Sequence, residues 1–421
     1  MRRLLEGRGA LALIAAAAAV PRLAALAFER GDILAEYVEK SDSFALSFVE
    51  TGTFGLVPGE PSAYTQPLYG FFLVPLYWLF GHSWLAVGLA QIALAVATAL
   101  LVYAIGLRVV SRPAAAVAAL LATLHPYLVW HDVHVNREIV DQLVAATLAL
   151  GYLLLARRPT AQAALLAGTA GGLAVLGNAR LAGLPLVLAL VAVWERGWSR
   201  RALATAAASF AVAAVVVSPW VVRNQVQLGC FAITTDARAL WKANNPLTYD
   251  ILASGRWIDD VPDLPGAPPT PADAEARYER TGDVLQIDEC ALMSFYRERV
   301  FDFWREQPGE KARLSAQAVG MLWNPLTTET AGRPGEGTWL DFARRWPEAL
   351  WALAVFAAAL LGLRTVDPAF RRLALAIVAY VTLTAVVFVG ATRYRVPFDF
   401  VFCILAASTL DWLHERRRRP A

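Results

Sequence analysis

The sequence predicts an all-α polytopic membrane protein with about ten transmembrane helices, an external interfacial loop and a small, mainly helical external domain. Hydrophobic residues make up 57% of the 421-residue chain, and the mean hydropathy is +0.46. Both values are too high for an ordinary soluble domain. Long runs of alanine, leucine and valine recur with few charges inside them. Because lipid offers no hydrogen-bond partners, each run must satisfy its own backbone groups as a helix.

Ten stretches have the length of a membrane-spanning helix, which needs roughly 20 mostly apolar residues. They are 10–28, 84–107, 113–130, 139–156, 161–178, 181–195, 202–221, 346–363, 373–390 and 397–413. Ten spans place the arginine-rich short connections on one side, so both termini are expected to be cytoplasmic by the positive-inside bias. The first span is expected to stay uncleaved, because its apolar run lacks a convincing cleavage site. The net charge of +3 follows this topology and predicts no nucleic-acid partner.

The chain divides into three parts on this topology. Residues 1–221 form a transmembrane core with an acidic first external loop at 29–83, residues 222–345 an external domain, and residues 346–421 the C-terminal transmembrane helices. Within the loop, the apolar stretch 67–81 is short, interrupted by a proline and rich in Tyr and Trp. These features are typical of a helix that lies at the membrane interface and does not cross it.

Short landmarks follow one another in a particular order along the chain. They are Arg22 in the first span, Asp32, Glu36, Glu39 and Asp42 in the first loop, residues 51–54, the segment 61–69 (PSAYTQPLY), the acidic turn 131–138, and the segments 219–224 and 392–397. This order resembles the polytopic C-type glycosyltransferases, in particular the bacterial family similar to protein O-mannosyltransferases and lipid A aminoarabinose transferases. The resemblance implies a sugar donor linked to polyprenyl phosphate and an active site on the external side of the bacterial inner (cytoplasmic) membrane.

Three carboxylates are candidates for catalysis. In the resembled family, a first-loop carboxylate activates the acceptor, and counting back from residues 51–54 makes Glu36 the nearest carboxylate and Asp42 the alternative. Glu138 fits the place of a further acidic residue before the fourth span. Attack on an anomeric carbon requires a positioned base for the acceptor hydroxyl. The alternatives are that the loop carboxylates are only solvated charges, and that Glu138 only caps a helix near its positive end.

Cationic residues at the external helix ends are candidates for binding the donor phosphate. The resemblance assigns this role to an arginine at the start of the last span, which corresponds to Arg393 or Arg395. Arg180, Arg223 and Lys242 lie near other external helix ends and are further candidates. A guanidinium neutralises a departing phosphate with fixed geometry. The alternative is that these side chains only reach for lipid headgroups.

Aromatic and amide side chains near the external face are candidates for sugar binding, because an apolar ring face and amide hydrogen bonds suit a sugar. They are Tyr64, Gln66 and Tyr69 in the first loop and Trp241, Asn244 and Asn245 after the seventh span. The sequence Asn244-Asn245-Pro246 is equally typical of a simple turn.

A divalent metal is a further possibility, because imidazole and carboxylate ligands suit Zn or Mn. The candidate ligands are His131, Asp132 and His134, which can equally make only hydrogen bonds. On the external face, Cys230 and Cys290 either pair in an oxidising compartment or stay free.

The sequence favours an inverting hexosyl or pentosyl transferase that uses a lipid-linked donor and an acceptor in the cell envelope, with membrane lipids around it. No Walker loop or dinucleotide-binding glycine motif is present, and a lipid-linked donor requires neither. Two alternatives are a transporter or flippase of lipid-linked sugars and a non-enzymatic membrane scaffold. A transporter predicts charged or broken spans and internal symmetry, whereas a scaffold leaves the acidic loops without a role.

Overall fold

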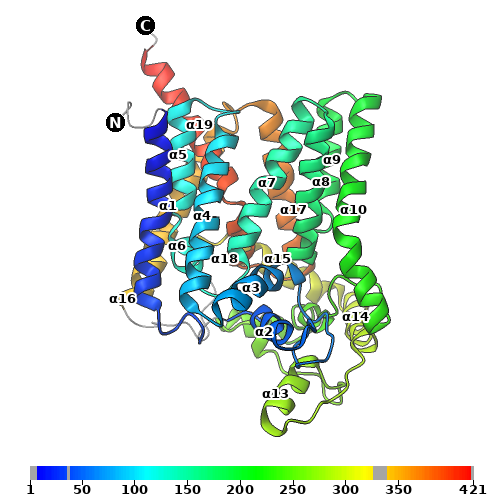
Figure 1. The fold of residues 1–421 in the computed structure, drawn as a ribbon. Coiled ribbons are helices and arrows are strands. Elements are labelled where there is room, and N and C mark those ends of the chain that lie inside the picture. The colour runs from blue at the N-terminus through cyan, green and yellow to red at the C-terminus, as the bar shows by residue number, and fades with distance from the viewer. Residues whose placement is uncertain (1–6, 36–37, 326–338, 419–421) are drawn as a thin grey trace.

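The computed structural model describes residues 7–35, 38–325 and 339–418, and these ranges contain helices and loops but no strand. Figure 1 shows an upright helical bundle with a layer of shorter helices across one end. Helix α1 begins and α19 ends at the opposite end of the bundle. The predicted all-α fold class is therefore confirmed.

The upright helices are α1 (Arg8–Glu29), α4 (Trp84–Gly106), α5 (Arg112–Thr123), α7 (Glu138–Arg157), α8 (Ala161–Gly177), α9 (Leu184–Glu195), α10 (Arg200–Leu228), α16 (Trp339–Gly362), α17 (Pro368–Val387) and α19 (Phe400–Arg418). The shorter elements are α2 (Ser41–Thr51), α3 (Pro67–Phe80), α6 (Pro126–His131), η2 (Ala179–Leu181), α11 (Ala237–Lys242), α12 (Thr248–Ala253), η3 (Ile258–Asp260), α13 (Pro271–Thr281), α14 (Glu289–Glu306), α15 (Pro308–Trp323), α18 (Thr392–Arg395) and η4 (Val396–Phe398).

Each of the ten predicted segments contains a helix, although the segment 113–130 is divided between α5 and α6. In the described ranges, five helices are long and apolar enough to cross a membrane: α1, α4, α7, α10 and α17. A sixth span is possible if the pair Thr392–Phe398 and Phe400–His414, bent by 54°, counts as one. The shorter apolar helices include α3, α5 and α8. A total of ten spans therefore stays a prediction.

Small residues let the helices of the bundle approach closely. Helix α8 packs between α7 and α10. A Cβ atom added at Gly168 of α8 would lie 2.4 Å from the backbone oxygen of Ser209, and one at Gly172 would lie 2.6 Å from the Val216 side chain. Close backbone contact of this kind is how helices associate inside lipid, where apolar burial gives no driving force.

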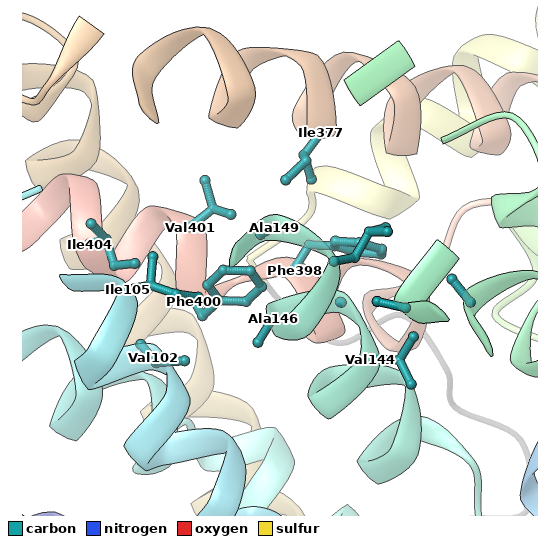
Figure 2. Packing of buried hydrophobic residues seen from close by; sticks show 14 of the residues in the cluster. Val102, Ile105, Val144, Ala146, Ala149, Ile377, Phe398, Phe400, Val401 and Ile404 are labelled. Carbon is teal, nitrogen blue, oxygen red and sulfur yellow. The ribbon is translucent and has the colours of Figure 1, made fainter. Parts of the chain in front are cut away.

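The centre of the bundle is an apolar core where α4, α7, α17 and α19 meet (Figure 2). Phe398 and Phe400 lie beside the bend between η4 and α19, and both are about 5% exposed. Packing at this bend fixes the preceding segment α18, which carries two of the candidate arginines.

A disulfide joins Cys230, just after α10, to Cys290 in α14. It settles the two alternatives for these cysteines in favour of pairing. Because α10 is a long apolar helix and α14 belongs to the layer at the bundle end, the bond ties that layer to the bundle.

Candidate functional site

Arg137, in the turn before α7, connects three segments that are far apart in sequence. Its backbone N–H donates to Glu39 Oε2 over 3.1 Å, and its Nη1 donates to Gln66 Oε1 over 2.6 Å. Nη1 also lies 3.5 Å from Glu39 Oε1. The Glu39 backbone N–H donates in turn to the Val135 carbonyl. The acidic first loop and the PSAYTQPLY segment are thus both fixed to the 131–138 turn.

Glu138 begins α7 and pairs with Arg393 from α18, 255 residues further along the chain. Arg393 Nε donates to Glu138 Oε1 over 2.7 Å. The Glu138 side chain is 4% exposed, whereas that of Arg393 is 28% exposed. Among the residues that the structure describes, Glu138 Oε2 is buried and has no hydrogen-bond partner. A buried carboxylate oxygen without a partner is costly, so this atom is a candidate for direct contact with a substrate.

A small, narrow pocket lies beside this pair. Its polar lining comes from Arg137, Glu138, Asp141, Asn178 and Arg393. We refer to Glu39, Arg137, Glu138, Asp141 and Arg393 as the charge cluster. The first loop, the 131–138 turn and the 392–395 segment therefore converge at one place.

Burial raises the pKa of the Glu39 carboxyl, and the charge of Glu138 acts in the same direction. The charges of Arg137 and Arg393 oppose the increase in pKa. A carboxyl group whose pKa is raised toward neutrality can exchange a proton more readily near neutral pH. The sequence marks Glu39 only as one member of the acidic stretch in the first loop.

The two neighbouring arginines of α18 have different environments. Arg395 is 1% exposed and pairs with Asp399 over 3.2 Å. Its Nη1 donates to the carbonyl of Leu322 in the last turn of α15 over 2.9 Å. Arg223 donates to the carbonyls of Ser62 and Phe54 over 2.8 and 2.7 Å. These contacts hold a helix end and a loop, whereas Arg393 lies in the charge cluster.

The remaining first-loop candidates contribute unequally. Asp42 Oδ1 accepts hydrogen bonds from the Tyr77 hydroxyl and from His82 Nε2, so it contacts the end of α3. The Tyr69 hydroxyl donates to Gln91 Oε1 over 2.7 Å, and the Tyr64 ring lies under Lys40 Nζ at 4.2 Å. Among the proposed sugar ligands of this loop, only Gln66 contacts the charge cluster. Glu36 lies outside the described residues.

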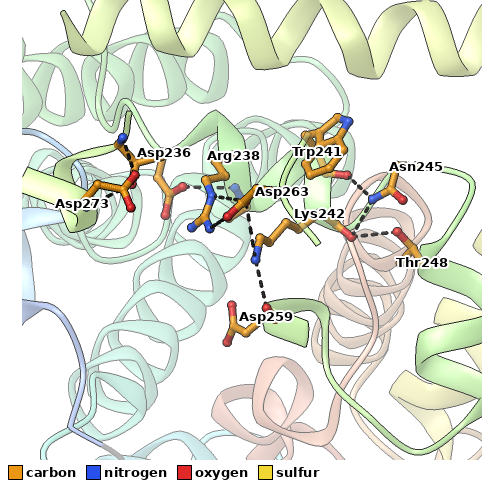
Figure 3. Close-up of polar contacts among 11 residues, drawn as sticks. Asp236, Arg238, Trp241, Lys242, Asn245, Thr248, Asp259, Asp263 and Asp273 are labelled. Atoms are coloured by element: carbon orange, nitrogen blue, oxygen red, sulfur yellow. Dashed lines mark hydrogen bonds and ion pairs between the residues drawn. The ribbon is translucent and has the colours of Figure 1, made fainter. Parts of the chain in front are cut away.

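The candidates that follow α10 lie in the layer of shorter helices at one end of the bundle. Figure 3 shows Trp241, Lys242 and Asn245 with their polar contacts. Trp241 packs against Tyr296 in a buried cluster, and Lys242 Nζ donates to the Asp259 carbonyl over 2.9 Å. Asn244 Oδ1 accepts from Lys311 Nζ over 2.6 Å. Asn245 Nδ2 donates to the Trp241 carbonyl, and Oδ1 accepts from the Leu247 N–H. The two asparagines therefore hold a turn, which is the alternative that the sequence left open.

The three metal candidates are held separately. Asp132 pairs with Arg22 over 2.6 Å, with both side chains at most 1% exposed. His131 stacks on Tyr127 with 3.7 Å between ring centroids, and His134 Nδ1 lies 3.0 Å from the Trp130 carbonyl oxygen. In the described ranges, no group of three His, Cys, Asp or Glu side chains is placed to hold a metal ion.

An apolar groove lies between α16, α17 and α19. Trp323 and Phe356 line it. The Arg395 guanidinium lies 5.0 Å from the centre of the Phe356 ring, so the groove begins beside α18.

Residues 61–222 match the family described as dolichyl-phosphate-mannose-protein mannosyltransferase. The match covers less than half of the chain; it contains Gln66, Arg137 and Glu138, but neither Glu39 nor Arg393. No curated protein sequence matches the chain significantly.

Solved structures of similar fold include the archaeal oligosaccharyltransferase AglB from Archaeoglobus fulgidus, in complex with an inhibitory peptide and a dolichol-phosphate. It shares 15% identity with a TM-score of 0.54 over 97% of this chain and 51% of AglB, so the chain spans about half the length of AglB. ArnT from Cupriavidus metallidurans bound to undecaprenyl phosphate shares 16% identity over 97% of this chain and 79% of ArnT, and its TM-score of 0.42 is too low to support an argument.

The chain is thus a multi-pass membrane protein with the fold of the polytopic C-type glycosyltransferases. The resemblance that the order of landmarks predicts is confirmed at this level.

Proposed function

We propose that this protein is a glycosyltransferase that moves a sugar from a polyprenyl-phosphate donor to a hydroxyl of a cell-envelope acceptor. The observation that carries the proposal is Glu138, which has one oxygen held by Arg393 and the other unpartnered beside a cavity. The fold that the chain shares with AglB, which was solved with a dolichol-phosphate, supports a lipid-linked donor.

The reaction follows from this arrangement. The acceptor oxygen attacks the anomeric carbon and forms the new glycosidic bond. The bond from that carbon to the phosphate oxygen breaks, and its electron pair leaves with the phosphate, so the anomeric configuration inverts. Glu138 Oε2 takes the acceptor proton, while Oε1 remains bonded to Arg393. The positive charge of Arg393 and Arg137 offsets the negative charge that grows on the phosphate.

The apolar groove between α16, α17 and α19 fits the isoprenoid chain of such a donor. Its lining is almost wholly apolar, and it begins at Phe356, beneath Arg395. Arg395 and Arg393 are two residues apart, so a chain in the groove would have its head near the charge cluster. Filling the groove with Ala359→Trp is expected to weaken the use of long-chain donors more than that of short-chain donors.

The external side is the proposed location of the reaction. The disulfide between Cys230 and Cys290 lies in the layer that carries α14, and disulfides persist in oxidising compartments. The charge cluster lies at the same end of the bundle, because α18 and the start of α7 are there. The arginine-rich connections predict that the opposite end is cytoplasmic.

The test is sugar transfer by the full chain in detergent from a panel of polyprenyl-phosphate sugars. We expect transfer from at least one donor, and a loss of about 10²-fold to 10⁴-fold in Glu138→Gln, the range for a general base. Glu195→Gln is the matched control, because Glu195 also pairs with an arginine, Arg372, at the far end of α9. Movement of intact donor between leaflets without transfer would instead support a flippase.

A further inference from the structure

Arg180, in η2 between α8 and α9, is an arginine near the charge cluster that the proposed reaction does not yet use. Its guanidinium carbon lies 3.8 Å from the ring centre of Tyr394 and 5.1 Å from that of Phe388. Its backbone is fixed at both polar atoms: the N–H donates to Asn178 Oδ1, and the carbonyl accepts from the Tyr380 hydroxyl over 2.8 Å. The aromatic contacts and this anchored backbone hold the side chain in place.

Arg180 differs from the other arginines of the site in its charge environment. Arg137 pairs with Glu39, Arg393 with Glu138 and Arg395 with Asp399. Within the described part of the chain, no carboxylate lies within ion-pair distance of Arg180. Burial lowers the pKa of Arg180, and the charges of Arg137 and Arg393 also lower it, whereas Tyr394 raises it. An anion bound here would relieve this concentration of positive charge.

We propose that Arg180 binds the phosphate of the lipid-linked donor. This inference rests on the proposed function and adds a residue to it. A guanidinium stacked on an aromatic ring keeps its edge free for two parallel hydrogen bonds to phosphate oxygens. Arg180 and Arg393 both lie beside Tyr394, at 3.8 and 5.8 Å from its ring centre. The two side chains thus hold a phosphate from two sides, next to Glu138.

The test measures binding of a ten-carbon polyprenyl phosphate, the matching polyprenol and phosphatidylglycerol to the full chain in detergent. We expect Arg180→Gln to weaken polyprenyl-phosphate binding about tenfold to a hundredfold, the scale of hydrogen bonds to a charged group. Arg180→Lys should recover part of the affinity, because lysine lacks the two-pronged geometry. Binding of the alcohol and of phosphatidylglycerol should not change.

The matched control is Arg313→Gln. Arg313 also stacks on a tyrosine, at 3.5 Å from the Tyr249 ring centre, but it pairs with Glu310 in α15. Its replacement should leave all three affinities unchanged. Unchanged polyprenyl-phosphate affinity in folded Arg180→Gln protein would overturn the proposal, and so would an equal loss of phosphatidylglycerol binding, which would indicate a general headgroup contact. Failure of the proposed function appears differently, as phosphate binding that depends on Arg180 without sugar transfer from any donor.

Discussion

Two arginine–carboxylate ion pairs of this protein, Arg22–Asp132 and Arg393–Glu138, differ in how completely their polar atoms are hydrogen-bonded. Arg22 and Asp132 join α1 to the turn after α6 and are almost completely buried. Every polar atom of this pair has a role: Arg22 Nη1 donates to the carbonyls of Ala18 and Thr123, and Asp132 Oδ1 accepts from Gln142 Nε2 over 2.8 Å. Within the described ranges, the Arg393–Glu138 pair leaves Glu138 Oε2 without a hydrogen-bond partner, and the pair borders a small pocket.

The difference separates structural charges from charges available for chemistry. A buried ion pair with all its hydrogen bonds made holds helices in register, and neither partner can be removed without leaving an uncompensated charge. Among the described residues, the Arg393–Glu138 pair combines an unused oxygen with a partly exposed arginine, and so retains capacity for a substrate. The Arg395–Asp399 pair also has unpartnered atoms, but both of its side chains are almost completely buried.

Asp132→Ala should give the largest effect on stability. It leaves the Arg22 guanidinium buried without a counter-charge, which costs about 3–5 kcal/mol. Thermal unfolding in detergent measures the loss, and the double variant Arg22→Met/Asp132→Leu should recover much of it. A wild-type unfolding temperature for Asp132→Ala would show that this pair does not hold the bundle.

Replacing Arg393 should mainly affect sugar transfer, whereas replacing Arg395 should mainly affect stability. Arg393→Ala is expected to lower sugar transfer about 10²-fold to 10³-fold, the effect of removing one charge-stabilising donor. It should lower the unfolding temperature less than Arg395→Ala does, because the Arg393 side chain is 28% exposed, whereas that of Arg395 is 1% exposed. Arg395→Ala should instead mainly lower the unfolding temperature, because it removes the guanidinium that pairs with buried Asp399 and that donates to the Leu322 carbonyl of α15. Transfer assays and thermal unfolding on both variants give the comparison. If both variants lost the same amount of transfer activity and the same amount of stability, the proposed difference between Arg393 and Arg395 would be wrong.

Glu289→Ala should lower the stability of the protein by an intermediate amount. Glu289 Oε2 accepts from the Ala63 N–H over 3.0 Å and from the Thr235 hydroxyl over 2.6 Å, next to the disulfide at Cys290. Loss of these charge-assisted bonds should cost about 1.5–3 kcal/mol and disturb the loop that carries Gln66. Limited proteolysis of the loop that carries Gln66 measures this disturbance, and Glu289→Ala should be cleaved faster than wild type. Glu298→Ala, at an exposed position of α14, is the control and should be cleaved at the wild-type rate. Equal cleavage rates in the two variants would show that Glu289 does not hold the loop.

The pH dependence of sugar transfer should reflect the protonation of Glu39, and this is the smallest of the expected effects. Ionised Glu39 holds Arg137, and burial raises the pKa of Glu39 above 4.5, its ordinary value. Transfer should therefore fall as pH decreases through this raised pKa, before an ordinary glutamate would protonate. In Glu39→Gln, kcat/KM should lose this acidic limb, whereas Glu50→Gln, at an exposed position of α2, should keep it. An unchanged pH profile in Glu39→Gln would exclude Glu39 as the titrating group.

Composition and arginine spacing predicted the fold class and the positions of the helices, because lipid leaves a long apolar run few alternatives to a helix. Glu138 and Arg393 were each candidates from the sequence, but their pairing comes from the fold, because they lie 255 residues apart. The role of Glu39 was not foreseen, because four carboxylates of one loop look alike in sequence, and the Arg137 backbone N–H that selects Glu39 lies 98 residues away. For the same reason, Asn244 and Asn245 could not be assigned: their partners come from the surrounding fold.

The most direct test of the central claim is a cryo-EM structure of the full chain with a short polyprenyl phosphate bound. The account predicts phosphate density beside Tyr394, within hydrogen-bond distance of Arg393 and Arg180, with Glu138 Oε2 facing the atom that the sugar would occupy. Phosphate bound at Arg395, Arg223 or Lys242, with the cavity beside Glu138 unchanged, would contradict it.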